Sequence, residues 1–307
     1  MQTRIIIRIL SVAAVLLVAS LSLAAQKGPL TVGSKIDTEG ALLGQMIILM
    51  LEKNGYAVED KTEFGPTPIV RKAITSGEID IYPDYTGNGA FYFNTQDSSL
   101  WRDRARAYER VKKLDFQENN LIWLTPAPAN NTWALAVRGE LARGKNLRTL
   151  EDFARYVNGG GEVKLAACEE FVSRGDALPS FEKAYGFDLQ DEQMIVFSGC
   201  NTAQTEKAAA QGTSGVNTAM AFGTDGSLAA LGLVVLEDTK NVQPVYAPTA
   251  VVRKEVFTEY LELESILAPV FATLNQKTLQ DLNARVAIGG ENVRAVAADF
   301  LEEKGFY

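Results

Sequence analysis

The stretch LIWLTPAPANNTWALAV, residues 121–137, joins two short apolar runs through a segment that cannot be helical. Leu121–Leu124 and Trp133–Val137 have the length and composition of buried strands. Pro126 and Pro128 disfavour helical backbone in the residues before them, so the segment between the two runs is extended. We interpret this stretch as the end of one α/β unit, a crossover and the start of a second unit.

Outward from this crossover, short apolar runs alternate with amphipathic stretches, which is typical of parallel sheets covered by helices. Before it, we expect strands at Leu30–Val32 and Glu78–Tyr82, a helix capped by Thr38 that stops at Asn54-Gly55, a helix from Thr67-Pro68 to Gly77, and a helix over 100–117. After it, we expect strands at Val163–Ala167, Met194–Ser198 and Val216–Phe222 and helices over 150–157 and 202–211.

A second proline-punctuated segment, Gln243–Pro248, offers the return crossover. Residues 255–307 are almost entirely helical in pattern, without a core of their own, so we expect them to pack on the first unit. The prediction is a two-lobed α/β protein with lobe 1 at 27–130 plus 245–307, lobe 2 at 131–244, and a ligand cleft between them. Ligands of open α/β sheets bind beyond the carboxyl ends of strands, which would face this cleft.

The N-terminus has the layout of a secretory signal peptide over residues 1–24. Arg4 and Arg8 precede an apolar run, and the small residues Ser22 and Ala24 suit a cleavage site. A membrane anchor is the alternative, but the run is shorter than the roughly 20 residues a spanning helix needs. Since no cysteine lies near this junction, we expect a periplasmic protein without a lipid anchor.

Composition excludes several classes of function. A net charge of −8 argues against a nucleic-acid partner. The chain has no histidine, so Ser-His-Asp catalysis is impossible and the commonest zinc ligand is missing; we expect no metal and no cofactor. Cys168 and Cys200 follow two expected strands and could form one disulfide or remain two thiols.

The residues that follow the expected strands are rich in aromatic rings, amides and fixed cations. The candidate ligand-binding residues are Lys35, Tyr85, Asn88, Asn131, Trp133, Arg174, Phe222, Thr224 and Asp225. Aromatic faces attract a methylated ammonium group, and lysine or arginine can hold a carboxylate, so this set suits a small betaine. Each residue also has an ordinary structural interpretation: the rings as core, the cations as surface residues, and Asp84 and Asp225 as turn residues.

Five segments in this order resemble the glycine betaine/choline-binding family of ABC-transporter substrate-binding proteins, closest to its osmotically regulated periplasmic branch. The segments are Gly33–Glu39, Ile81–Gly89, Ala129–Trp133, Glu170–Asp176 and Phe222–Gly226. The resemblance spans essentially the whole chain after the N-terminal run. It implies a two-lobed periplasmic-binding-protein fold of the type II-like kind, no enzymatic activity, and a monomer that delivers its solute to a membrane permease and an ATPase.

The resemblance also implies roles for individual residues. Tyr85, Trp133 and Phe222 match positions of an aromatic cage for a quaternary ammonium group, and Asn131 matches a polar position at its mouth. Lys35 and Arg174 match positions that bind the ligand carboxylate.

Three departures from the family pattern bear on the ligand. Asn88 replaces a usual threonine, Gly40 replaces a glutamine, and the region of Glu206 lacks a further cage tyrosine. A cage short of one ring loses about 0.5–2 kcal/mol, roughly a three- to thirtyfold drop in affinity. The alternatives are weak betaine binding or another amino-acid-like solute, an enzyme that uses Asp84, Asp225 or Cys168, and a sensory module.

Overall fold

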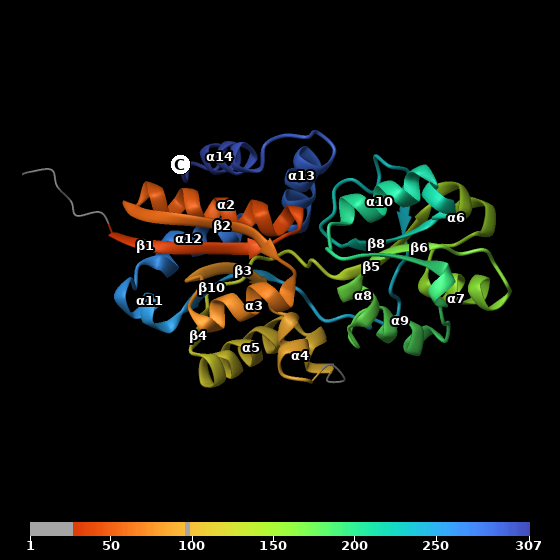
Figure 1. The fold of residues 1–307 in the computed structure, drawn as a ribbon, viewed down its shortest axis with the longest axis horizontal. Coiled ribbons are helices and arrows are strands. Elements are labelled where there is room, and N and C mark those ends of the chain that lie inside the picture. The colour runs from red at the N-terminus through yellow and green to blue at the C-terminus, as the bar shows by residue number, and fades with distance from the viewer. Residues whose placement is uncertain (1–26, 96–98) are drawn as a thin grey trace, which may run out of the picture.

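The computed structural model describes residues 27–95 and 99–307, and within them the chain forms two five-stranded sheets flanked by helices. The expected signal peptide lies outside the described residues. The two sheets lie side by side, each with its own layers of helices (Figure 1). This is a two-domain α/β fold.

The first sheet has the strand order β2-β1-β3-β10-β4. Its strands are β1 (Lys27–Lys35), β2 (Tyr56–Gly65), β3 (Ile81–Tyr85), β4 (Leu121–Trp123) and β10 (Pro248–Arg253). The helices on this side are α2 (Thr38–Lys53), α3 (Thr67–Ser76), α4 (Asn88–Tyr92), α5 (Arg104–Asn119), α11 (Lys254–Glu259), α12 (Leu263–Thr273), α13 (Gln276–Ala287) and α14 (Val293–Glu303), with a 3₁₀ turn at Ser99–Arg102.

Helix α2 is the central helix of this half. Its residues from Glu39 to Leu51 are buried, because α14 covers it on the side away from the sheet. Burial of each large apolar side chain stabilises the fold by about 1.5–3 kcal/mol, and Leu42, Leu43, Ile47 and Leu51 are fully buried. The helix is therefore a rigid support for the residues at its N-terminus.

The second sheet has the order β7-β6-β8-β5-β9. Its strands are β5 (Trp133–Arg138), β6 (Leu165–Cys168), β7 (Met194–Phe197), β8 (Thr218–Phe222) and β9 (Leu233–Val235). Its helices are α6 (Gly139–Lys145), α7 (Leu150–Asn158), α8 (Glu169–Ser173), α9 (Leu178–Tyr185) and α10 (Thr202–Gln211), with 3₁₀ turns at Asp191–Gln193 and Thr213–Gly215.

Both sheets are mixed, so the expectation of parallel sheets is wrong in part. Strand β10 pairs antiparallel with β3 and β4, and β5 pairs antiparallel with β8 and β9. The reason is topological. Each of these two strands, β10 and β5, follows directly from a segment that connects the sheets (Figure 1), so it enters its sheet at the edge where its neighbour, β3 or β8, ends.

Local expectations differ from the structure at three places. The strand expected at Glu78–Tyr82 begins three residues later, because the amides of Glu78 and Ile79 still bond to the carbonyl of Ala73 and complete helix α3. Asp37, rather than Thr38, caps α2 by accepting a hydrogen bond from the Gly40 amide at 2.7 Å. The sequence pattern does not predict strand β2, because this charged edge strand lacks a clear alternation of apolar and polar residues.

None of the helices in the described part of the chain combines the length and apolar character that crossing a membrane requires.

Candidate ligand-binding site

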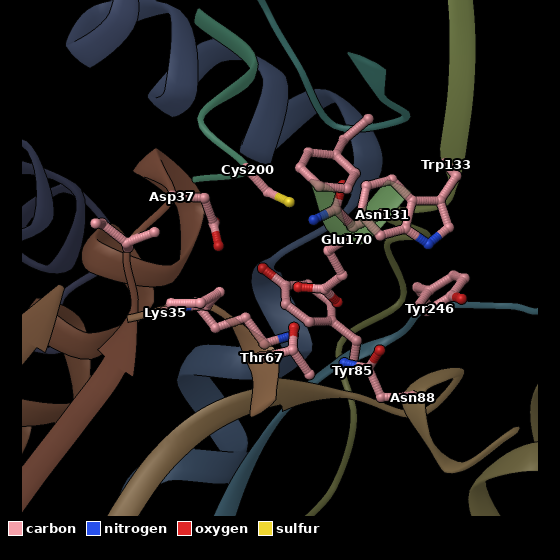
Figure 2. Close-up of a pocket in the computed structure, with 13 residues that line it drawn as sticks. Lys35, Asp37, Thr67, Tyr85, Asn88, Asn131, Trp133, Glu170, Cys200 and Tyr246 are labelled. Carbon is pink, nitrogen blue, oxygen red and sulfur yellow. The ribbon is translucent and has the colours of Figure 1, made fainter. Parts of the chain in front are cut away.

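A pocket lies between the two sheets, with free space of about 440 Å³ that includes the part open to solvent. Side chains from both sheets and from both connecting segments face it (Figure 2). Its lining residues are Lys35, Ile36, Asp37, Pro66, Thr67, Tyr85, Asn88, Asn131, Trp133, Glu170, Cys200, Phe222 and Tyr246.

Antiparallel pairing explains why an early residue of one strand meets a late residue of another. Trp133, the first residue of β5, is the register partner of Phe222, the last residue of β8. Tyr85, the last residue of β3, is paired in the same way with Pro248, the first residue of β10. The mixed topology therefore places ends and beginnings of strands at the same edge, facing the pocket.

Four aromatic side chains contribute to this lining: Tyr85, Trp133, Phe222 and Tyr246. The rings of Trp133 and Phe222 are tilted by 39° with centroids 4.6 Å apart. Tyr246, in the second connecting segment, packs on the backbone at Gly87, where a Cβ atom would lie 2.8 Å from the Tyr246 ring. Gly87 is thus required for the close approach of this ring.

The Lys35 ammonium group is held by an acidic partner at the base of the pocket. Its Nζ lies 3.1 Å from Oδ1 of the buried Asp84 and 4.7 Å from the centroid of the Tyr85 ring. Asp84 also accepts hydrogen bonds from the hydroxyl of Tyr92 at 2.8 Å and the amide of Asn88 at 2.7 Å. Burial opposes ionisation of Asp84, but Lys35 and these donors hold its pKa below the usual range.

Arg174 does not line the pocket, although it lies directly behind the lining. Its guanidinium forms a fork on Asp176 at 2.9 and 2.8 Å and donates to Glu170 at 2.7 Å. It also donates across to Asn88 Oδ1 at 3.0 Å and to the Tyr246 hydroxyl at 3.3 Å. These contacts use all five guanidinium N–H groups.

Two carboxyl groups and one amide oxygen without a hydrogen-bond donor are further polar groups of the pocket. Asp37 and Glu170 both line it. Burial raises the pKa of Asp37, and Lys35 opposes this effect. Among the residues that the structure describes, none donates to the buried Oδ1 of Asn131. A ligand group can therefore supply the missing partner.

Thr224 and Asp225 lie outside the lining, in the turn that follows Phe222. Asp225 accepts from the Phe222 amide and from the Thr202 hydroxyl at 3.0 Å, so it fixes the end of β8. Burial and the neighbouring Glu206 raise the pKa of Asp225 well above its usual range. Glu206 itself is buried and is not a lining residue, so no aromatic side chain reaches the pocket from its position.

Cys168 and Cys200 form a disulfide with their Cα atoms 5.0 Å apart, which decides between the two alternatives left open by the sequence. Cys168 ends β6, and Cys200 lies in the loop after β7 and lines the pocket. The disulfide anchors this loop beside the ligand space.

The structure thus brings six of the sequence candidates into the lining: Lys35, Tyr85, Asn88, Asn131, Trp133 and Phe222. It places Arg174, Thr224 and Asp225 behind it. The sequence reasoning missed Tyr246, Glu170, Asp37 and Thr67 as lining residues. Tyr246 could have been found from its aromatic ring within a proline-flanked crossover, and Glu170 from its place in the motif segment Glu170–Asp176.

Residues 28–303 match the family described as the substrate-binding domain of ABC-type glycine betaine transport systems. The glycine betaine-binding protein YehZ of Escherichia coli (strain K12) is 55% identical over 291 residues, which cover 94% of this chain and 95% of the relative. A glycine-betaine-binding protein of Pseudomonas aeruginosa is 34% identical, with coverage of 91% and 89%.

Solved structures agree with this similarity. A structure of apo YehZ from Escherichia coli has a TM-score of 0.67 at 56% identity and covers 92% of this chain and 100% of that chain. A structure of a glycine betaine/carnitine/choline ABC transporter has a TM-score of 0.70 at 22% identity, covers 90% and 99%, and shows the same fold.

Proposed function

We propose that this chain, which belongs to the family of substrate-binding domains of ABC-type glycine betaine transport systems, binds glycine betaine or a related quaternary ammonium compound in the pocket between its sheets. The family role is non-enzymatic: such a protein binds a small ligand and interacts with the permease and ATPase of an importer. The enzymatic alternative is thereby set aside. Asp84 is paired with Lys35, and Cys168 is held in a disulfide.

The observation that carries the proposal is the convergence of aromatic rings from separate parts of the chain. Tyr85 comes from the first sheet, Trp133 and Phe222 from the second, and Tyr246 from a connecting segment. A trimethylammonium group cannot donate hydrogen bonds, so the negative faces of such rings are its best partners, each worth about 0.5–2 kcal/mol.

The charged residues suggest how a zwitterion would be oriented. Asp37 and Glu170 add negative charge to the lining and favour the ammonium end of a ligand. Lys35 is the lysine of the lining, so we assign the carboxylate of a betaine to its side of the pocket. Arg174 would have to release Glu170 or Asn88 before it could contact a carboxylate, so its role as a ligand contact stays a prediction.

We further propose capture by closure of two lobes, with 27–130 plus 245–307 as lobe 1 and 131–244 as lobe 2. Contacts between them support a closed arrangement, such as Arg174 to Asn88 and Gln280 Nε2 to the Gly223 carbonyl at 3.1 Å. A ligand that contacts both lobes shifts the population toward this arrangement. The expected setting is the periplasm, and the expected state is a monomer.

Calorimetry against a panel of glycine betaine, choline, carnitine and proline betaine tests the proposal, with 3,3-dimethylbutan-1-ol as the uncharged isostere of choline. We expect choline to bind at least about tenfold more tightly than this alcohol, because only the cation interacts with the ring faces. Equal affinities for the two would refute a cation-binding cage.

Two variants at position 133 distinguish the contribution of the aromatic face to ligand binding from the contribution of apolar volume. Trp133→Phe keeps an aromatic face, whereas Trp133→Leu keeps only apolar bulk. We expect the leucine variant to bind choline about three- to thirtyfold more weakly than the phenylalanine variant. Similar losses in both variants would assign Trp133 to packing alone.

A further inference from the structure

Glu39, in the first turn of α2, is a buried carboxyl group that the ligand contacts described above do not use. It is 4% exposed. One oxygen, Oε1, accepts a hydrogen bond from the Tyr85 hydroxyl at 3.0 Å, and the other, Oε2, accepts one from Nδ2 of Asn283 at 2.7 Å. A single carboxyl group thus fixes a ring of the pocket and attaches it to α13.

The same amide of Asn283 reaches the other half of the molecule. Its Nδ2 also donates to the backbone carbonyl of Thr224 at 3.0 Å, two residues after Phe222. The turn lies close against α13, since a Cβ atom at Gly226 would lie 1.8 Å from the Gln280 carbonyl oxygen. A continuous chain of contacts therefore runs from Tyr85 through Glu39 and Asn283 to the end of β8.

The charge state of Glu39 affects both ends of this chain. Ionised, it draws the Tyr85 hydroxyl proton toward itself and makes the ring a better partner for a cation, and it adds negative charge behind the ring. Protonated, it can offer a hydrogen of its own and loses that charge. Burial raises the pKa of Glu39 to about 7, although its hydrogen bonds oppose this rise, so both states are populated near neutrality.

Other titratable groups lie on the elements around Glu39. Asp37, the N-cap residue of the same helix, repels its charge, and Lys35 ends the adjoining strand β1. Tyr85 lies in front of it, and burial keeps the pKa of this hydroxyl well above its usual range. Asp225, in the turn beyond Asn283, has a pKa raised by burial. Glu39 and Asp37 are therefore the two groups whose titrations an experiment must distinguish.

We propose that Glu39 is a positioning residue that couples occupancy of the aromatic pocket to contact between the lobes and releases a proton to solvent when a cation binds. This inference rests on the proposed function. Coupling is reciprocal: if the ionised carboxylate strengthens cation binding, then cation binding favours the ionised carboxylate. The proton balance is simple, because the carboxylic acid becomes a carboxylate and the buffer takes the proton.

The test is calorimetry of choline binding at pH 6, 7 and 8 in two buffers with different ionisation enthalpies. A quaternary ammonium ion has no proton to lose, so any linked proton belongs to the protein. A charge hydrogen-bonded to a ring that contacts the cation changes affinity by about tenfold in a partly buried site, so we expect binding about fivefold tighter at pH 8 than at pH 6. We also expect a fraction of a proton released at pH 7.

Two variants show which residue causes the pH dependence of binding and the proton release. Glu39→Gln keeps the shape of the side chain and should flatten the pH profile and abolish proton release. Asp37→Asn keeps a residue that caps helices well and should retain the pH slope, whatever its effect on affinity. A pH-independent wild type, or a slope that survives in Glu39→Gln, would overturn the proposal.

A second measurement does not depend on a ligand. Asn283→Ala breaks the connection to Thr224, and we expect small-angle scattering of the ligand-free protein to show a larger radius of gyration than for the wild type. If no quaternary ammonium compound binds the wild type, the proposed function fails. An unchanged radius in Asn283→Ala would then reject the connection as well.

Discussion

Titration of Glu39 should make the wild-type protein less stable as the pH rises, although it makes cation binding tighter. Glu39→Gln should remove both pH dependences. The pKa of Glu39 is raised from 4.5 to about 7 in the folded protein. Such a group favours folding while it is protonated, and this contribution is lost as the pH rises through the folded pKa. The shift corresponds to about 3 kcal/mol between pH 4.5 and pH 8.

Glutamine resembles the protonated acid and does not titrate. We therefore expect the difference in the free energy of unfolding, variant minus wild type, to increase by about 3 kcal/mol from low to high pH. A constant offset is also expected, because the glutamine amide faces the Asn283 amide, but an offset does not alter the slope. Asp37, whose pKa is also raised, titrates in both proteins, so only its repulsion of Glu39 enters the difference.

The assay is urea unfolding at pH 4.5, 6, 7 and 8, followed by tryptophan fluorescence and by circular dichroism. Coincidence of the two probes must be checked first, because two lobes can unfold separately. Parallel pH profiles for the wild type and Glu39→Gln would refute the reasoning, since they would mean that Glu39 titrates alike in the folded and unfolded states.

Three further outcomes are expected. Gly87→Ala should weaken choline binding, measured by calorimetry, because the added Cβ atom would lie 2.8 Å from the Tyr246 ring and displace it; unchanged affinity would contradict this role for the ring. Reducing the Cys168–Cys200 disulfide should lower the free energy of unfolding by about 3–4 kcal/mol, as for a loop of roughly 32 residues, and denaturant curves with and without reductant give the value. Gly226→Ala should separate the lobes, since its Cβ atom would lie 1.8 Å from a carbonyl oxygen of α13; scattering indistinguishable from the wild type would count against that contact.

Much of the fold could be predicted because its signals are local. Helix α10 occurs at the expected residues, Thr202–Gln211, and Gly77 ends α3 in the left-handed conformation with a φ of 79°. These features depend on caps, turn residues and periodicity within a few positions of each other. The directions of β5 and β10 in their sheets do not depend on such local features, because the sequence of a strand does not determine which neighbouring strand it pairs with.

The candidate site was predictable to the extent that its residues lie in recognisable motifs. Tyr85, Trp133 and Phe222 each lie in a motif segment, and all three line the pocket. The role of Arg174 was not predictable in this way, because its partners Asn88 and Tyr246 are 86 and 72 residues distant. A sequence shows that a guanidinium is present, but not whether its donors are already used.

The sequence by itself determined two α/β units joined by two extended crossovers, and the aromatic and amide residues placed next to them. These follow from steric limits at proline, from helix caps and from apolar periodicity, which act over a few residues. Only the tertiary structure decided that Tyr246 joins the other aromatic rings of the pocket, that Asp84 pairs with Lys35, and that Glu39 meets Asn283 across 244 positions. Contacts of this kind depend on how finished helices and sheets pack, because burial removes water and leaves each polar group to find a partner among whatever side chains the packing brings within reach.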